Sequence, residues 1–170
     1  EIFIIDRYLI TYGYVPLWVL NNILTIGQIS KFYSIMKQQD RQNVSKVFHI
    51  QDNQLENILF YLSSVRNFCA HGNRLYCFRT KRPLADMQAH ISLAIPQTDG
   101  KEYDYGKRDL FAAMLALHYV LPAATYKKLI KEIYRLFSTL SPKLSVLRED
   151  DILKEMGFPN DWRNKLLSLK

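Results

Sequence analysis

The residues with the clearest chemical potential in this sequence are three polar side chains in one short stretch, Arg66, Asn67 and His71. If the stretch is helical, Arg66 lies about 20° from the apolar stripe that begins at Leu55. A guanidinium there needs an anionic or carbonyl partner, or a second chain, because burying an unpaired charge is costly. Asn67 and His71 are four residues apart and stack on a different face. Such an Arg and His could converge at the rim of a groove or at a symmetric dimer interface.

The same spacing also has a structural explanation. An Arg with a His five positions later occurs often by chance, and Arg66 could bridge a structural carboxylate. His71 could be a residue that the helix dipole favours at a C-terminus. On spacing alone the structural explanation is the more common one, so both stay open at this point.

A basic and aromatic segment follows directly. Its cationic and aromatic members are Arg74, Tyr76, Phe78, Arg79, Lys81 and Arg82. No acidic residue occurs between Glu56 and Asp86. Basic side chains neutralise phosphates and aromatic rings stack on unpaired bases, so the segment is a candidate RNA-binding surface. A solvated basic loop is the alternative.

Helices must position these residues, because apolar residues recur with helical spacing through most of the chain. The expected helices cover residues 16–23, 26–36, 40–48, 53–71, 107–120, 126–140 and 150–156, with a last turn from 161. Thr25 and Gln28 have the spacing of a capping box, and Gly72 is a plausible helix stop. By the same periodicity, Cys69 is expected in the core on the face of Leu62.

Residues 73–106 behave differently, because the helical period is lost there. Pro83, Pro96 and Gly100 interrupt the segment. Within it, apolar residues alternate with smaller ones over residues 91–95, which predicts a short strand or hairpin. A long irregular segment of this kind is often functional or mobile.

Composition sets the outer limits. The chain has 170 residues, 48% of them hydrophobic and 23% charged, which indicates one folded domain and excludes a disordered tail. Lys and Arg total 23 against 16 Asp and Glu, and the net charge of +7 suits a polyanionic partner. Cys69 and Cys77 have neither disulfide density nor metal-ligand spacing, so a reducing cytoplasm and no metal site are expected. No segment is long and apolar enough to span a bilayer.

Several segments together resemble the Abi-like (abortive-infection) family of bacterial proteins. They are residues 15–20, 24–30, 32–33, 66–71, 74–76, 110–113 and 156–162. They follow the family order over nearly the whole chain. The resemblance implies an all-α, HEPN-like helical bundle over residues 1–170, with 73–106 as a long basic loop or small hairpin insertion. Because the chain opens on Glu1 and begins inside the family pattern, we expect it to be the C-terminal portion of a longer Abi-like protein.

The resemblance also implies an activity. The HEPN signature is an Arg, usually followed by a polar residue such as Asn, with a His four to six positions after the Arg; Arg66, Asn67 and His71 match it. HEPN proteins are typically metal-independent endoribonucleases without a cofactor, in which two protomers form one composite site. Abi-like members are associated with phage defence, in which infected cells stop growing. The implied partners are RNA, a second copy of the chain and a neutralising antitoxin protein or RNA, with no membrane.

The implied chemistry fits these residue types, since RNA carries its own nucleophile, the 2′-hydroxyl beside the scissile phosphate. His71 would serve as general base or acid, because imidazole titrates near neutral pH. Arg66 would stabilise charge on the phosphate, and Asn67 would orient His71 or a phosphate oxygen. The family often has Asn after Arg-Leu-Tyr, where this chain has Cys77. Two other functions stay open, a non-catalytic RNA-binding module and a helical interaction scaffold.

Overall fold

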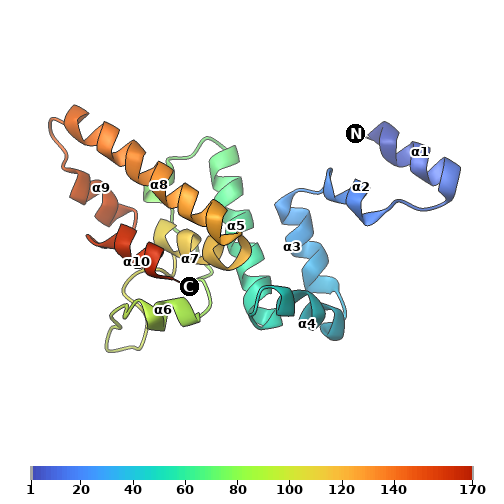
Figure 1. Cartoon of the computed structure of the whole chain (residues 1–170), viewed down its shortest axis with the longest axis horizontal. Coiled ribbons are helices and arrows are strands. Elements are labelled where there is room, and N and C mark those ends of the chain that lie inside the picture. The colour runs from blue at the N-terminus through green and yellow to red at the C-terminus, as the bar shows by residue number, and fades with distance from the viewer. Residues whose placement is uncertain (1, 170) are drawn as a thin grey trace.

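The computed structural model describes residues 2–169, and every regular element in that range is helical. The elements are α1 (Ile2–Tyr12), α2 (Leu17–Asn21), α3 (Ile26–Ile35), α4 (Gln38–Val47), α5 (Asp52–Ala70), η1 (Leu75–Cys77), α6 (Gln88–Ser92), α7 (Leu110–Val120), α8 (Ala123–Leu140), η2 (Ser141–Lys143), α9 (Glu149–Glu155) and α10 (Trp162–Ser168). Figure 1 shows α5 between the N-terminal helices and a body formed by the later ones. The expected all-α fold is confirmed.

The core is built around α7. Its residues 110–116 are all buried, and α5 and α8 both contact it. A helix that is apolar on every side is expected in the middle of a bundle, because no face of it is suited to water. Rings from the C-terminal segment complete the core, where Phe158 lies edge-on to Phe111 at 5.5 Å and to Trp162 at 5.3 Å between ring centroids.

The longest helix, α5, joins the two parts of the molecule. Its buried residues include Leu55, Ile58, Tyr61 and Leu62, and it contacts α3 and α4 as well as α7. The expected capping box is present at the start of α3, where the Thr25 side chain and the Gln28 side chain each bond the other's backbone. The capping box fixes the start of α3, which then packs against α5.

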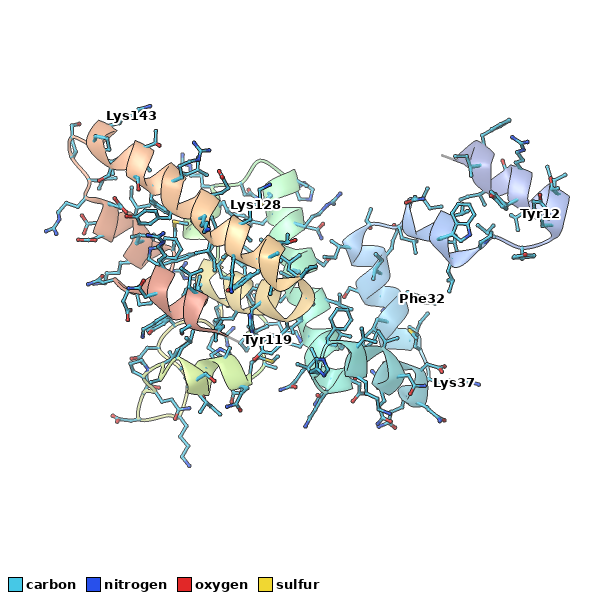
Figure 2. The ribbon with its side chains drawn as sticks, in the orientation of Figure 1. Tyr12, Phe32, Lys37, Tyr119, Lys128 and Lys143 are labelled. Carbon is cyan, nitrogen blue, oxygen red and sulfur yellow. The ribbon has the colours of Figure 1, made fainter. Side chains whose placement is uncertain are left out.

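The N-terminal helices expose many large apolar side chains. Those of α1, α2 and the loop between them are Phe3, Ile4, Leu9, Ile10, Tyr12, Tyr14, Leu17 and Trp18. The side chains of Tyr12 and Phe32 point away from the body in Figure 2. The helix α1 was not among the predicted elements, and α2 begins one residue later than predicted, because Pro16 is its cap. An exposed apolar surface of this extent is typical of an interaction site.

The segment 73–106 corrects one expectation. Residues 88–92, part of which were predicted as a strand, form the short helix α6, and the one β-bridge among residues 2–169 joins Gln97 and Tyr103. Leu93 and Ile95 are buried, whereas Ile91 is exposed. A five-residue helix is too short to show a helical period, so its apolar residues give the same pattern as a strand.

Two helix starts differ by three residues from the prediction. α7 begins three residues later than expected, because the Asp109 carboxylate accepts a hydrogen bond from the Ala112 N–H and caps the helix there. α8 begins three residues earlier than expected, directly after Pro122. Both errors lie at the ends of helices, where a single capping residue decides the boundary.

Candidate functional site

The end of α5 carries all three signature residues. The helix ends at Ala70, and the N–H of His71 still donates to the Asn67 carbonyl at 3.1 Å. Gly72 then takes a φ of +68°, and the Asn73 N–H returns to the Phe68 carbonyl at 3.3 Å. This backbone reversal satisfies the last helical carbonyls and needs the left-handed conformation that glycine adopts easily. Arg66, Asn67 and His71 therefore lie on the last turns of one rigid element.

The Arg66 side chain is exposed, and its Nη1 donates to the Asn67 Oδ1 at 3.2 Å. The expected apolar stripe is buried at Leu55 and Leu62, but it does not stay buried to the end of the helix. Cys69, which was predicted in the core, is exposed as well. In the last turns of α5 it is Val65 and Phe68 that pack against the core, whereas Arg66 and Cys69 are exposed. In a single chain Arg66 therefore carries no desolvation cost and is free to meet an anion or a second protomer.

His71 is exposed at the helix end, and its imidazole has no hydrogen-bond partner among residues 2–169. Both ring nitrogens are therefore open to an incoming ligand. The Asn67 side chain contacts Arg66 rather than His71 in the single chain. The partial negative charge of the helix C-terminus lies beside His71.

The basic segment is held against α5 by one buried ring. Phe78 is 2% exposed and packs edge-on against Phe68 at 5.1 Å and Tyr61 at 6.1 Å between ring centroids. Arg74, which directly precedes η1, and Tyr76, which lies within it, are exposed close after the helix end. The buried Phe78 thus keeps the first part of the segment next to the signature residues.

The later basic side chains point in different directions. The Arg79 Nη2 donates to the Glu155 carbonyl at 2.7 Å and lies 3.9 Å from the Glu155 carboxylate. The guanidinium carbon of Arg82 lies 4.8 Å from the centroid of the Phe60 ring on α5. Lys81 is exposed, and its carbonyl accepts from Arg108. Sequence reasoning grouped these cations into one surface, but the structure divides them between α9 and α5.

Two hollows lie beside this segment. The smaller one, of about 490 Å³, lies between α3 and α5 and includes Asn67 and Arg82 in its lining. The larger one, of about 760 Å³, lies between residues 98–109 and α9 and includes Arg79. Arg66 and His71 line neither of them. The signature is thus connected to the smaller hollow through Asn67.

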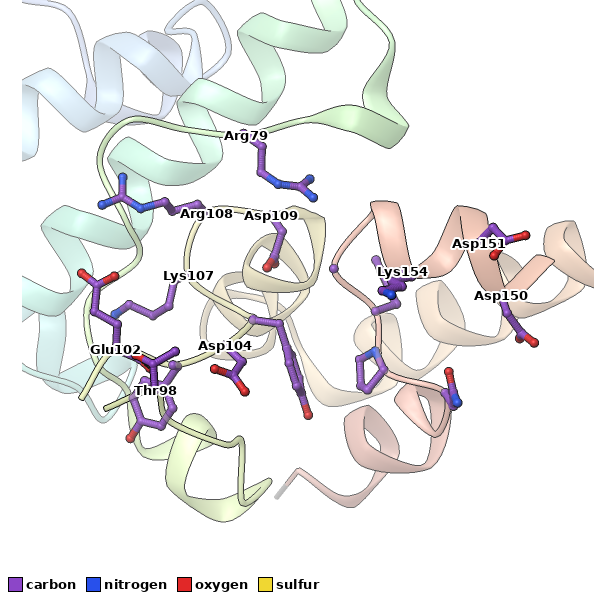
Figure 3. A pocket seen from close by; sticks show the side chains of 16 residues that line it. Arg79, Thr98, Glu102, Asp104, Lys107, Arg108, Asp109, Asp150, Asp151 and Lys154 are labelled. Carbon is purple, nitrogen blue, oxygen red and sulfur yellow. Dashed lines mark hydrogen bonds between the residues drawn. The ribbon is translucent and has the colours of Figure 1, made fainter. Parts of the chain in front are cut away.

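The larger hollow has a mixed lining (Figure 3). Its charged members are Arg79, Glu102, Asp104, Lys107, Arg108, Asp109, Asp150, Asp151 and Lys154. Several of these already have partners, since Lys107 pairs with Asp86 at 2.6 Å and Arg108 donates to backbone carbonyls. The side chains of Arg79 and Asp109 lie along the upper side of this hollow. Charges that neutralise one another in this way give no single preference for an anionic ligand.

A buried polar junction lies at one wall of the larger hollow, and sequence reasoning missed it. The Asp109 carboxylate accepts from the N–H of Gly106 and of Ala112, both at 2.9 Å. The Tyr61 hydroxyl donates to the Asp109 carbonyl at 2.8 Å. Burial raises the pKa of the Asp109 carboxyl, whereas its hydrogen bonds from the two N–H groups lower it. An Asp just before a long apolar run is a cap signal that could have located this residue.

His90 is the second buried polar group that the sequence did not single out. Its side chain is fully buried, and its Nε2 lies 2.8 Å from the Gly106 carbonyl while its Nδ1 lies 3.1 Å from the Met87 backbone nitrogen. Since a carbonyl only accepts, Nε2 carries the proton. Burial lowers the pKa of His90, against the hydrogen bond to Gly106, which raises it. His90 therefore holds α6 to the loop before α7.

Two further observations concern the whole of residues 2–169. No group of three or more His, Cys, Asp or Glu side chains in this range is arranged to hold a metal ion. None of the helices in the range has both the length and the apolar character needed to cross a membrane.

Comparison with known proteins adds one match. The model of the family described as Abi-like protein matches residues 1–77. That range includes the signature and the first basic residues, namely Arg66, Asn67, His71, Arg74 and Tyr76, and it ends before Arg79. The resembling segments 110–113 and 156–162 lie outside it. No curated protein and no solved structure matches the chain. The family resemblance therefore rests on α1 to α5 and η1.

Proposed function

We propose that this protein is a metal-independent HEPN-type endoribonuclease that acts in abortive-infection phage defence, in the cytoplasm, by cleaving RNA until growth stops. The observation that carries the proposal is the shared exposed end of α5, where the Arg66 guanidinium lies beside Asn67 and the His71 imidazole is open. The match of residues 1–77 to the Abi-like family supports the biological role. The net charge of +7 supports a polyanionic substrate.

In the proposed reaction the 2′-hydroxyl of RNA attacks the adjacent phosphorus, and the bond to the 5′-oxygen of the next nucleotide breaks. His71 accepts the proton of the hydroxyl or donates a proton to the leaving oxygen. Arg66 binds the phosphate oxygens on which negative charge increases, because its planar fork matches them. The products are a 2′,3′-cyclic phosphate and a 5′-hydroxyl. DNA lacks the nucleophile and is not cleaved.

A homodimer with a composite site fits this chemistry. Two protomers would supply two His71 side chains, so that one accepts the proton and the other donates one. The exposed apolar side chains of α1 and α2 support such an association, because contact between protomers would remove them from water. The exposed Arg66 supports it as well, since it is free to reach across to a phosphate held between two copies.

The test is a cleavage assay on single-stranded and structured RNA in EDTA, with wild type, His71→Ala and His49→Asn. His49 is an exposed histidine whose φ of +55° suits asparagine, so His49→Asn is a matched control. We expect cyclic-phosphate ends from wild type and the control, and a rate about 10²–10⁴-fold lower for His71→Ala. Undiminished cleavage by His71→Ala would overturn the proposed role of His71. RNA binding without cleavage by wild type would favour the RNA-binding module instead.

A further inference from the structure

The smaller hollow, which we call the α3–α5 groove, includes two serines in its lining. Its lining is Gly27, Ser30, Lys31, Ser34, Glu56, Phe60, Ser63, Asn67 and Arg82. Ser30 and Ser63 are each 8% exposed as whole residues, and neither hydroxyl forms a hydrogen bond among residues 2–169. Neither Oγ is among the fully buried unpaired atoms of this range, so water reaches both. Both hydroxyls are therefore available to hydrogen-bond a polar ligand in the groove.

The helices α3 and α5 lie close together at Gly27 and Ser63. A Cβ at Gly27 would lie 3.1 Å from the Ser63 Oγ, so the glycine allows α3 to come close to this hydroxyl. Ser34, higher on the same helix, donates to the Lys31 carbonyl and is thus already satisfied. Ser30 and Ser63 are therefore the two hydroxyls of the groove lining that are open to a ligand.

The rim of the groove is positive. Among the described residues, Lys31 and Arg82 form no ion pair, whereas the one carboxylate, Glu56, is already held by Arg41 at 2.8 Å. Arg82 also covers the ring of Phe60, which is 38% exposed. A guanidinium stacked on an aromatic ring offers a flat, cationic surface on which a nucleobase can stack.

The groove leads toward the signature residues. Glu56, Phe60, Ser63 and Asn67 are spaced by four, three and four residues, so they follow one face of α5, and His71 is the next position of that series. From Ser63 to His71 the helix rises about 12 Å, at roughly 1.5 Å per residue. A strand lying along this face would therefore pass from the groove to the imidazole.

We infer that the α3–α5 groove is a subsite for one unpaired ribonucleotide of the RNA substrate, an inference that rests on the proposed function. Ser30 and Ser63 bond its ribose hydroxyl and phosphate oxygens, and Lys31 neutralises the phosphate. The base stacks on the Arg82 guanidinium, which requires a base whose face is not covered by neighbours in a duplex. The strand then continues along α5 to His71. The groove thus selects single-stranded RNA and sets where it is cleaved.

The test measures binding separately from cleavage. Fluorescence anisotropy with a labelled single-stranded RNA of twelve nucleotides, in EDTA, uses full-length His71→Ala protein as the parent. Ser63→Ala and Arg82→Gln are added to it, and we expect each to lower affinity about tenfold, the scale of one lost hydrogen bond or stacking contact. The same RNA in a perfect duplex should bind at least tenfold more weakly than the single strand.

Matched controls separate the groove from the rest of the molecule. Ser64→Ala removes a neighbouring hydroxyl that bonds the Phe60 carbonyl and does not line the groove. Arg135→Gln removes an exposed guanidinium on α8 that pairs with Glu132. Both should bind like the parent. Ser63→Ala should melt no lower than the parent, since it loses a hydroxyl that has no partner.

The outcomes of this test are distinct from those of the cleavage assay. Parent-like binding by Ser63→Ala and Arg82→Gln, equal binding of duplex and single strand, or no RNA binding at all would each overturn the subsite. Cleavage by wild type together with unaffected binding in the groove variants would overturn the proposed subsite but not the proposed nuclease activity. RNA binding that depends on the groove, without any cleavage by wild type, would support the proposed subsite and overturn the proposed nuclease activity.

Discussion

The two polar centres of this molecule are built in opposite ways. At the buried junction, which we extend here to His90 because both groups bond Gly106, the Asp109 carboxylate and the His90 imidazole each have two backbone partners. Burial shifts the pKa of both. At the end of α5, Arg66 and His71 are exposed. The Arg66 side chain donates one hydrogen bond, to Asn67, and the His71 side chain has no partner among residues 2–169. A shifted pKa marks a functional site in many proteins. Here the two groups with shifted pKa values connect elements of the fold through hydrogen bonds. The candidate catalytic side chains, in contrast, are exposed to water.

The comparison predicts that Arg66→Ala separates activity from stability. We expect RNA cleavage to fall about 10²–10³-fold, the effect of removing one charge-stabilising donor. The free energy of unfolding should stay within about 0.5 kcal/mol of wild type, because Arg66 is exposed and bonds only Asn67. Urea unfolding and cleavage rates measured on one preparation check both expectations. A loss of stability of several kcal/mol with the rate preserved would make Arg66 a structural residue of an interaction scaffold.

Two glycines, Gly157 beside the buried junction and Gly72 at the exposed end of α5, allow the two regions to be compared in stability. Both have positive φ, +81° at Gly157 and +68° at Gly72. A Cβ at Gly157 would lie 2.3 Å from the Asp109 Cγ, whereas one at Gly72 would meet nothing within 4 Å. Gly157→Ala should therefore cost roughly 2–5 kcal/mol, from overpacking and left-handed strain together. Gly72→Ala should cost only the strain, about 1–2 kcal/mol. Chemical denaturation of both variants measures the difference, and equal losses would contradict it.

The buried junction also predicts a pH dependence of stability. His90 has a folded-state pKa below its ordinary value of 6.5, because burial disfavours the charged ring. Below pH 6.5 the unfolded chain thus binds a proton that the folded chain does not, so stability is lost as pH falls from 6.5 toward the folded-state pKa. The raised pKa of Asp109 acts in the opposite sense, since protonation of that carboxyl favours the folded state.

Unfolding titrations at pH 7.5 and 5.5 measure this dependence. We expect wild type and His49→Asn to be less stable at pH 5.5, and a His90→Asn variant to show a smaller difference between the two pH values. The same difference in His90→Asn as in wild type would assign the effect to another group.

The smallest expected effect concerns the exposed cations. Lys81→Gln should lower RNA affinity modestly and reduce the slope of log K against log salt concentration by about 0.7, as for one lost phosphate contact on a single strand. Lys127→Gln, on the exposed face of α8, is the matched control and should leave the slope unchanged. Anisotropy titrations at several salt concentrations check both variants. A reduced slope for Lys127→Gln instead would place the RNA on α8.

Much of the helical fold was open to prediction, because its signals act within a few residues. The Thr25–Gln28 capping box, the stop at Gly72 and the apolar run from Phe111 were each recognisable from neighbours in sequence. The short helix α6 was not, since five residues carry too little pattern to distinguish a helix from a strand. The spacing of Arg66, Asn67 and His71 likewise follows from the sequence, and one helix end keeps them together.

Only the tertiary structure decided which of these residues are covered. Helical periodicity tells which side chains share a face, but not which face the rest of the molecule covers at each turn. Arg66 and Cys69 were therefore predicted on a buried stripe, whereas the structure covers Val65 and Phe68 and leaves those two exposed. The close approach of Gly157 to Asp109 and the groove that Ser30 and Ser63 both line each bring together positions far apart in the chain. The sequence determined which groups this protein can use, because local geometry depends on adjacent residues. The packing of distant helices determined which of them water and a substrate can reach.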